Sequence, residues 1–443
     1  MADHNIPLQP LLRWIALVLR RDEGSCGLQP FPDEEAVRLL HEQFKPEINR
    51  LKRAGEHPEK ANISPRGSLT AECLTPSSFL FQEEFCEVNR TVVGFLALKW
   101  LSENNHGVFT RNQSENRLSR VTFTRLRNMV RESLKGADDI LAVIVLLVLS
   151  DMGKDPELKN EMKDRDLENA NHDHVLHRAV DSGLFSEPLR LLSQAAGDVI
   201  LGIQLGAVLN IPQLVQGESV PGSLLGIFQW PERAFRLKCL EVIFDVSGAS
   251  GHVGAEGAIC MTQPVCQSLL DTLPLLKDVV DGASSVKAAY NGVLQHRAEI
   301  LAAAGVRHLS VDNANDRVLL RLCAMGRVTD QKSAQLFEQA FNKLSDGIKQ
   351  QLTSGLNVDG DGDGDGVAVI LYYMPAMFAQ AQRLTRSQPD SKRGQMLQKL
   401  MHAMAEEYAA NTSSSGKIIE KDMSYLKGRM QQWAQEADSV NWR

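Results

Sequence analysis

Apolar residues recur at intervals of three and four along most of this 443-residue chain, and this spacing constrains its fold more than any other feature. In "EEAVRLLHEQFKPEINRL", for example, Val37, Leu40, Phe44 and Ile48 form one such series. Residues with this spacing share one face of an α-helix, whereas a half-buried strand requires alternation of apolar and polar residues. Alternating stretches are scarce, so we expect an all-α protein with a single large helical body and long polar loops.

An acidic run of glycines, "DGDGDGDG" at residues 359–366, indicates a division of this body. It begins like an EF-hand calcium loop, but Ile370 occupies the twelfth position, where a glutamate is needed. We therefore interpret it as a flexible linker. The expected parts are a main helical domain over 1–354, an acidic glycine-rich linker over 355–366, and C-terminal helices over 367–443 that pack on the main body. One of those helices is expected in "GKIIEKDMSYLKGRMQQWAQEAD".

A second glycine-rich stretch, "SGASGHVGAEGA" at residues 247–258, has no phosphate-binding pattern. It lacks the GxGxxG spacing and the lysine followed by serine or threonine that nucleotide loops use. Two interpretations stay open: a surface loop without a role, or a loop over a pocket in which His252 binds substrate.

The sequence shows no sign of membrane insertion or export. Its longest apolar run, Ile140 to Leu149, is about half of the roughly 20 residues that a bilayer-spanning helix needs. The apolar stretch at 14–19 is followed by Arg20 and Arg21, whereas a secretory signal has its basic residues first. Seven cysteines without CxxC spacing suggest reduced thiols, so we expect a cytoplasmic protein without membrane contact.

The segment "ENANHDHVLHRAV" is unusually rich in histidine. In a helix, His174 and His177 share one face, and Asp173 lies four residues before His177. Three interpretations stay open. The segment is a helix start capped by Asn171, or a catalytic group in which Asp173 orients His177 as a general base, or part of a metal site.

Upstream of this segment, Asp151, Gly153 and Lys154 follow an apolar helix. Here the chain resembles HD-superfamily metal-dependent hydrolases and oxygenases, in which such a helix ends in a motif like LLHDIGK. The resemblance implies an HD-like helical core and a metal held by His106, Asp151, His174 and His177. Ser150 stands in place of the motif's histidine, and a single-metal site needs about three protein ligands. We therefore expect no metal and no cofactor, with the HD-type metal enzyme as the alternative.

A basic segment stands out in a chain with a formal net charge of −7. Residues 111–135 contain seven basic side chains against two acidic ones, whereas the acidic whole argues against a DNA-binding surface. Such a segment is able to position an RNA backbone, or it is a solvated helix face. The candidate RNA contacts are Arg117, Arg120, Arg125, Arg127 and Arg131.

The overall length, the cysteine-poor helical composition and the block "SDMGKDPEL … NHDHVLHRAV" resemble the arginine-containing cyclodipeptide synthases of filamentous fungi. The resemblance implies a secondary-metabolism enzyme that joins arginine from arginyl-tRNA to the amino acid of a second aminoacyl-tRNA. Both substrates are activated esters, so the absence of an ATP-binding motif is consistent with this chemistry.

This chemistry assigns expected roles to the polar residues. A carboxylate must receive the arginine guanidinium, and the candidates are Asp138, Asp139, Asp151 and Asp173. His174 or His177 would deprotonate the attacking amine, and Ser150 would accept an acyl group if a histidine reached it. If neither resemblance holds, the chain is a non-catalytic helical interaction protein.

Overall fold

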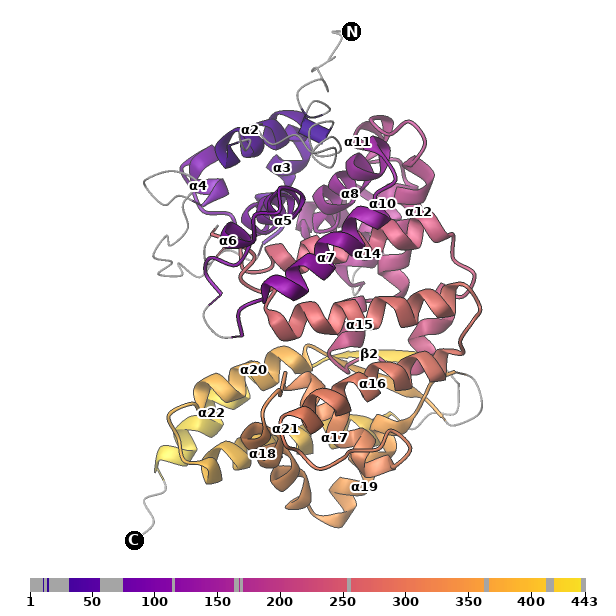
Figure 1. Cartoon of the computed structure of the whole chain (residues 1–443). Helices are drawn as coiled ribbons and strands as arrows, with labels where there is room; N and C mark the ends of the chain where they lie inside the picture. The colour runs from indigo at the N-terminus through magenta and orange to yellow at the C-terminus, as the bar shows by residue number, and fades with distance from the viewer. Residues whose placement is uncertain are drawn as a thin grey trace. The chain divides into compact units, whose positions relative to one another are not determined.

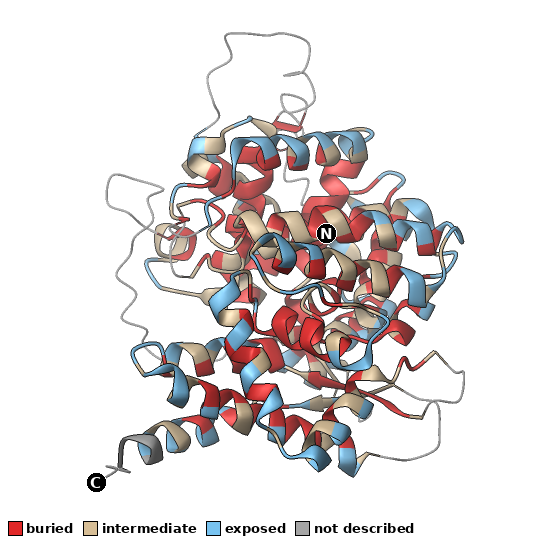
Figure 2. Cartoon of the chain, turned by 60° about the horizontal axis from the view of Figure 1, so that its bottom comes forward, coloured by how far each residue is buried: buried red, intermediate tan, exposed pale blue. Residues whose placement is uncertain are grey.

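The computed structural model describes residues 32–55, 75–113, 116–162, 170–252, 256–361, 366–411 and 418–439, together with Leu11, Trp14, Ile15 and Leu167. It confirms the all-α fold class, because this part of the chain is built of helices and two short strands (Figure 1). Buried and exposed residues recur along single helices (Figure 2), as in amphipathic helices. Within these residues, no helix is long and apolar enough to span a bilayer.

The chain forms two compact units in place of the predicted three parts. The first comprises residues 1–208 and 230–270, and the second comprises 209–229 and 271–443. The predicted linker at 355–366 therefore lies inside the second unit.

The start of this aspartate-glycine run explains the difference, because it is packed rather than extended into solvent. Asp359 is buried, and its carboxylate lies 2.8 Å from Arg317 Nη2 and 2.6 Å from Lys287 Nζ. Residues 362–365 of the predicted linker lie outside the described residues.

Three long helices form the centre of the first unit: α5 (Cys86–Ser102), α8 (Ala137–Leu149) and α14 (Glu232–Gly248). A Cβ atom at Gly94 would lie 2.8 Å from the carbonyl oxygen of Phe244, so glycine allows α5 and α14 to cross closely. From Asp139 onward every residue of α8 is buried, which explains its almost continuous apolar sequence.

The other elements of this unit surround this centre (Figure 1). They are α2 (Asp33–Gln43), α3 (Lys45–Leu51), α4 (Pro76–Phe81), α6 (His106–Phe109), α7 (Arg120–Ser133), η1 (Met152–Lys154), α9 (Pro156–Met162), α10 (His172–Asp181), α11 (Ser186–Arg190) and α12 (Ala196–Val208). The next long helix, α15 (Gln263–Val280), begins in the first unit and ends in the second.

The second unit is a helical bundle with one pair of strands. Its helices are α13 (Ile211–Val215), η3 (Pro221–Ile227), α16 (Val286–Ala303), α17 (Ala314–Met325), α18 (Gln331–Asn342), α19 (Asp346–Asn357), α20 (Met374–Leu384), α21 (Asp390–Ala410) and α22 (Leu426–Ser439). The strands β1 (Ala368–Tyr372) and β2 (Ile418–Asp422) pair in parallel, with Ala368 opposite Ile418.

The strand β2 corrects the prediction of a helix throughout residues 416–438. Ile418 packs against an apolar cluster that contains Val220, Ala368 and Ile370. Pairing with β1 lets the β-branched Ile418 join this cluster, and the helix begins only at Leu426.

Candidate functional site

The histidine-rich segment begins α10 as a capped helix. The Oδ1 atom of Asn171 accepts a hydrogen bond from the backbone N–H of His174 at 3.0 Å, which confirms the predicted cap. His174 is exposed, and His177 Nε2 lies 3.2 Å from Asp181 Oδ2. Asp173 does not orient His177, because Asp181 is the carboxylate beside that ring.

Asp151 follows the buried helix α8 and precedes the short helix η1, which packs against the start of α10. Its Oδ1 atom is 2.7 Å from Lys154 Nζ, and its Oδ2 atom is 3.4 Å from Arg90 Nε. Between these residues, a Cβ atom at Gly153 would lie 1.8 Å from the carbonyl oxygen of His172. Only glycine therefore lets η1 pack against the start of α10.

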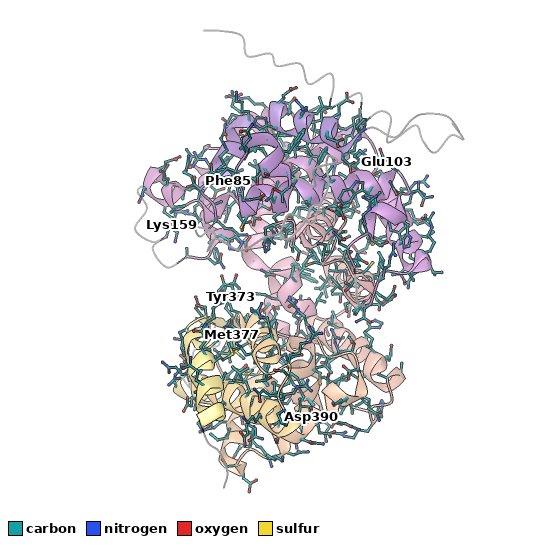
Figure 3. The ribbon with its side chains drawn as sticks, turned by 90° about the vertical axis from the view of Figure 1, so that its left-hand side faces the viewer. Phe85, Glu103, Lys159, Tyr373, Met377 and Asp390 are labelled. Carbon is teal, nitrogen blue, oxygen red and sulfur yellow. The ribbon has the colours of Figure 1, made fainter. Side chains whose placement is uncertain are left out.

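The helix α5 supplies two charged partners to Asp151, one turn apart. Glu87 Oε2 accepts a hydrogen bond from Lys154 Nζ at 2.9 Å. Arg90 donates two hydrogen bonds to Asp245, at 2.9 and 2.6 Å. Phe85, labelled in Figure 3, is the residue immediately before α5.

The helix α14 supplies the remaining charges. Lys238, Glu241 and Asp245 are three and four residues apart, so they share one face of the helix. Lys238 Nζ lies 2.6 Å from Glu241 Oε2, and the Glu241 side chain is buried. We use the term polar cluster for the following seven residues: Glu87, Arg90, Asp151, Lys154, Lys238, Glu241 and Asp245.

The polar cluster shifts the proton affinity of its carboxylates in opposite directions. Burial and the negative charge of Asp151 raise the pKa of Glu87 to about 7. Burial, only partly offset by Lys238, raises the pKa of Glu241 to about 7. Burial alone would raise the pKa of Asp151 too, but Arg90 and Lys154 hold it well below its usual range. The cluster thus combines a fixed anion with two groups that exchange protons near neutral pH.

Two buried oxygens in the polar cluster, Asp151 Oδ2 and Glu241 Oε2, accept no hydrogen bond of standard geometry from the described residues, although each lies beside a cationic side chain. Asp151 Oδ2 is ion-paired with Arg90 Nε at 3.4 Å, and the Asp151 carboxylate also interacts with the side chain of Glu87. A buried carboxylate oxygen usually has a donor, so these two oxygens are the places in the cluster with remaining capacity to accept a hydrogen bond. Arg90, Lys154 and Glu87 keep 27%, 21% and 15% of their side-chain surface exposed, so solvent reaches the edge of the cluster.

Two predicted residues lie at this edge. Burial would lower the pKa of Lys238, but the carboxylates of Glu241 and Asp173 outweigh it and raise that pKa. Asp173 therefore faces the cluster. His252 is half-buried, and burial together with the charge of Arg90 lowers its pKa, which keeps its imidazole neutral at pH 7.

The glycine-rich loop that carries His252 is held against the start of α5. A Cβ atom at Gly248 would lie 2.1 Å from the carbonyl oxygen of Arg90, and one at Gly251 would lie 2.5 Å from that of Asn89. Glycines therefore serve close backbone packing here, and they bring His252 near Arg90. Residues 253–255 of this loop lie outside the described residues.

Asp138 and Asp139 lie at the opposite end of α8 and already bind guanidinium groups of the chain itself. Arg233 donates to Asp138 Oδ2 at 2.9 Å and to Asp139 Oδ1 at 2.7 and 3.0 Å, and Arg236 donates to Asp139 Oδ2 at 2.8 Å. Burial would raise both pKa values, but these hydrogen bonds outweigh it and lower them. These aspartates bind guanidinium groups, as expected, but the guanidinium groups belong to Arg233 and Arg236 of α14.

The remaining predicted site residues are not brought together. Ser150 Oγ donates to the carbonyl of Leu147 at 3.0 Å, a bond within the helix end that does not activate the hydroxyl. His106 Nε2 lies 2.9 Å from the carbonyl oxygen of Leu118. Within the described part of the chain, no three His, Cys, Asp or Glu side chains are arranged to hold a metal. The metal alternative of His106, Asp151, His174 and His177 is therefore not assembled.

The basic segment forms an amphipathic helix with a charged outer face. Phe123, Leu126 and Val130 of α7 are buried. Arg117, Arg120 and Arg125 are exposed, and they donate to the uncharged side chains of Thr110, Asn104 and Gln267. Arg127 is partly exposed and Arg131 is exposed. Because Thr110, Asn104 and Gln267 carry no charge, the positive charge of the three arginines stays available to an anion.

The sequence interpretation missed Glu87, Arg90 and the charged face of α14. A signal was present, because Lys238, Glu241 and Asp245 interrupt the apolar and largely buried later part of α14. Charged residues at helical spacing on a buried face are rare unless they are paired. What the sequence does not contain is the partner, since α5 and α14 are about 150 residues apart.

Comparison with known proteins gives the family. A family model described as a family of unknown function, DUF6829, matches residues 37–438. The chain belongs to this family. No curated protein and no solved structure matches it. The match covers both units and includes the whole polar cluster.

Proposed function

We propose that this DUF6829 member is an aminoacyl-tRNA-dependent synthase that joins arginine to a second amino acid in a cyclic dipeptide. The polar cluster is its proposed active centre. The observation that carries the proposal is the placement of the buried, ion-paired carboxylate of Asp151 beside two carboxylates whose pKa values lie near 7.

The carboxylate of Asp151 suits a cationic substrate. The Oδ2 atom of Asp151 lies within a cluster of four carboxylates and three cationic side chains, so an incoming guanidinium or ammonium group gains charge-assisted hydrogen bonds. The arginyl group is the substrate part that carries such a cation.

Glu87 takes the role of general base that the sequence assigned to His174 or His177. A base works best when its pKa is near the operating pH, and Glu87 lies at the exposed edge of the cluster. His174 and His177 do not contact the cluster residues in the described structure.

The proposed reaction needs only transfer of protons and acyl groups. The amine nitrogen of one aminoacyl group bonds to the ester carbon of the other and loses a proton to Glu87. The ester C–O bond breaks, and the proton passes to the departing ribose oxygen of the tRNA. Attack of the second amine on the remaining ester closes the ring and releases the second tRNA in the same way. No oxidant, ATP or metal enters this balance.

The exposed arginines of α7 support the proposed tRNA partner. Arg117, Arg120 and Arg125 are solvent-exposed and bonded to neutral groups, and such side chains bind phosphates without reading sequence. We propose that this face contacts the acceptor stem.

The first test is production of the full chain in a bacterial or yeast host, followed by untargeted mass spectrometry of the extract. We expect a new cyclic dipeptide that contains arginine. Glu87→Gln keeps the size and hydrogen bonds of the protonated side chain but removes the base, so product should fall about 100-fold or more. Glu83→Gln is the matched control, because Glu83 is exposed and lies one turn before α5 proper.

Two outcomes contradict the proposal. One is the absence of any such dipeptide from cells that contain the folded protein. The other is equal product from wild type and Glu87→Gln. Metal analysis of the same preparation adds a separate result: about one equivalent of iron, manganese or zinc without a new metabolite would favour the HD-type enzyme instead.

A further inference from the structure

The second unit contains an open hollow of about 480 Å³ that the function proposed above does not use. It lies where the end of α18 and the start of α19 meet α21 and α22. Sites for small ligands typically measure roughly 300–1,000 Å³. The hollow is therefore large enough for one ligand of nucleotide size.

The lining of the hollow is positively charged. Lys343, Lys399 and Arg429 contribute cationic side chains from three different segments. Among the described lining residues, Glu406 is the one carboxylate, and its Oε1 atom lies 3.3 Å from His402 Nδ1. The excess of positive charge favours an anionic ligand.

An aromatic ring borders the same space. Trp433 lines this hollow and also a smaller one of about 60 Å³ beside it, so its indole is only partly covered by protein. The Nζ atom of Lys399 lies 5.4 Å from the centre of that ring. A partly uncovered indole next to cationic side chains offers a stacking face beside an anion site.

We propose that this hollow binds a phosphorylated ligand of mononucleotide size, with its base on Trp433 and its phosphate among Lys343, Lys399 and Arg429. The cationic side chains and the indole border the same space, which favours one ligand that carries both an anionic group and an aromatic ring. An inorganic anion would leave the indole and most of the volume unused, and an apolar ligand would cover the exposed Lys343 and Arg429 without offering either an acceptor. This proposal does not rest on the proposed synthase activity.

Calorimetric titration of the full chain with adenosine 5′-monophosphate tests the proposal. We expect one site per chain that is weakened by added salt, because the cations are exposed. Arg429→Gln and Lys343→Gln should each weaken binding about tenfold, as expected for loss of a hydrogen bond from a charged group. Trp433→Ala should weaken it by a similar factor through loss of stacking.

Lys427→Gln is the matched control, because Lys427 is exposed on α22 two residues from Arg429 but does not line the hollow. Its affinity should stay within about twofold of wild type. Adenosine and inorganic phosphate, each titrated alone, should bind at least tenfold more weakly than the nucleotide.

Three results would overturn the proposal. They are no saturable binding of the nucleotide by the folded wild type, equal weakening by Lys427→Gln and Arg429→Gln, or inorganic phosphate binding as tightly as the nucleotide. None of these results bears on dipeptide production, so the two proposals fail independently.

Discussion

The two ends of α8 both place aspartates beside arginines, yet the two arrangements differ in whether every aspartate oxygen accepts a hydrogen bond. At the start of the helix, Asp138 and Asp139 accept hydrogen bonds from Arg233, Arg236, Ser193 and the backbone of Lys135. After its end, Asp151 keeps one oxygen without a donor among the described residues, and Glu87 and Glu241 hold raised pKa values beside it.

This difference separates a structural role from a chemical one. A fully bonded carboxylate stabilises the ionised form and has no capacity left for a ligand. An incompletely bonded one, next to carboxylates that exchange protons near pH 7, is suited to binding and proton transfer. Asp139 and Asp151 are both stabilised as anions, and what distinguishes the second end is that Glu87 and Glu241 beside Asp151 are stabilised as acids.

The largest expected effect on stability is at the satisfied end. Asp139→Ala leaves Arg233 and Arg236 without their shared carboxylate in a mostly buried place. Removing one partner of such a network typically costs 3–5 kcal/mol, and the partial exposure of the arginines places this variant at about 3 kcal/mol. Urea unfolding measures the change. Dipeptide production per folded molecule should stay within about twofold of wild type, because Asp139 does not join the polar cluster.

A loss of product from Asp139→Ala without a loss of stability would reverse the comparison. It would mean that Asp139 is the carboxylate that meets the substrate and that its bonds to the arginines are replaceable. The predicted role of Asp138 and Asp139 in substrate binding would then stand.

The second prediction concerns the pH dependence of stability, which Glu241 should govern in the polar cluster. The pKa of Glu241 is raised in the folded protein from an ordinary 4.5 to about 7, so the native state holds a proton that the unfolded chain releases. Its contribution to stability is complete below about pH 4.5 and is lost as pH rises through 7. Since one pKa unit is worth about 1.4 kcal/mol, wild type should lose about 2 kcal/mol between pH 5 and pH 8 relative to Glu241→Gln.

The variant Glu241→Gln is uncharged at this position at every pH, so it is the reference for the pH dependence of wild-type stability. Guanidinium unfolding at several pH values gives the two curves. Parallel curves would show that Glu241 is ionised in the folded protein near pH 5, contrary to the shift described here. Asp139 has the opposite sign, because a lowered pKa adds stability that disappears only on acidification through that lowered value.

The fold class was predictable from the sequence because it depends on local periodicity. The series Val37, Leu40 and Phe44 lies on the buried side of its segment, and Asn171 caps the helix that it was expected to cap. Strand β2 was not predictable in this way. Its five residues form a strand only because β1, about 50 residues earlier in the chain, provides a partner.

The candidate site was predictable only in part, for a related reason. Asp151, Gly153 and Lys154 were identified from one continuous motif, and Gly153 is required by close packing on His172. The neighbours that determine the chemistry come from α5 and α14. Proton affinity depends on which charges lie close together in space. His174 and His177 were predicted from their residue type alone, whereas the raised pKa of Glu87 depends on neighbours that only the fold brings to it.

The smallest expected effect tests whether Asp138 has more hydrogen-bond donors than its carboxylate needs. Ser193 donates to Asp138 Oδ1 through both its hydroxyl, at 3.0 Å, and its backbone N–H, at 3.1 Å. Ser193→Ala removes only the hydroxyl, and Arg233 and the backbone donor remain. A hydrogen bond of this kind contributes about 0.5–1.5 kcal/mol, and exposure places the loss below about 1 kcal/mol in urea unfolding. A loss above about 2 kcal/mol would show that Asp138 depends on each donor, and that the start of α8 is as finely balanced as the polar cluster at its other end.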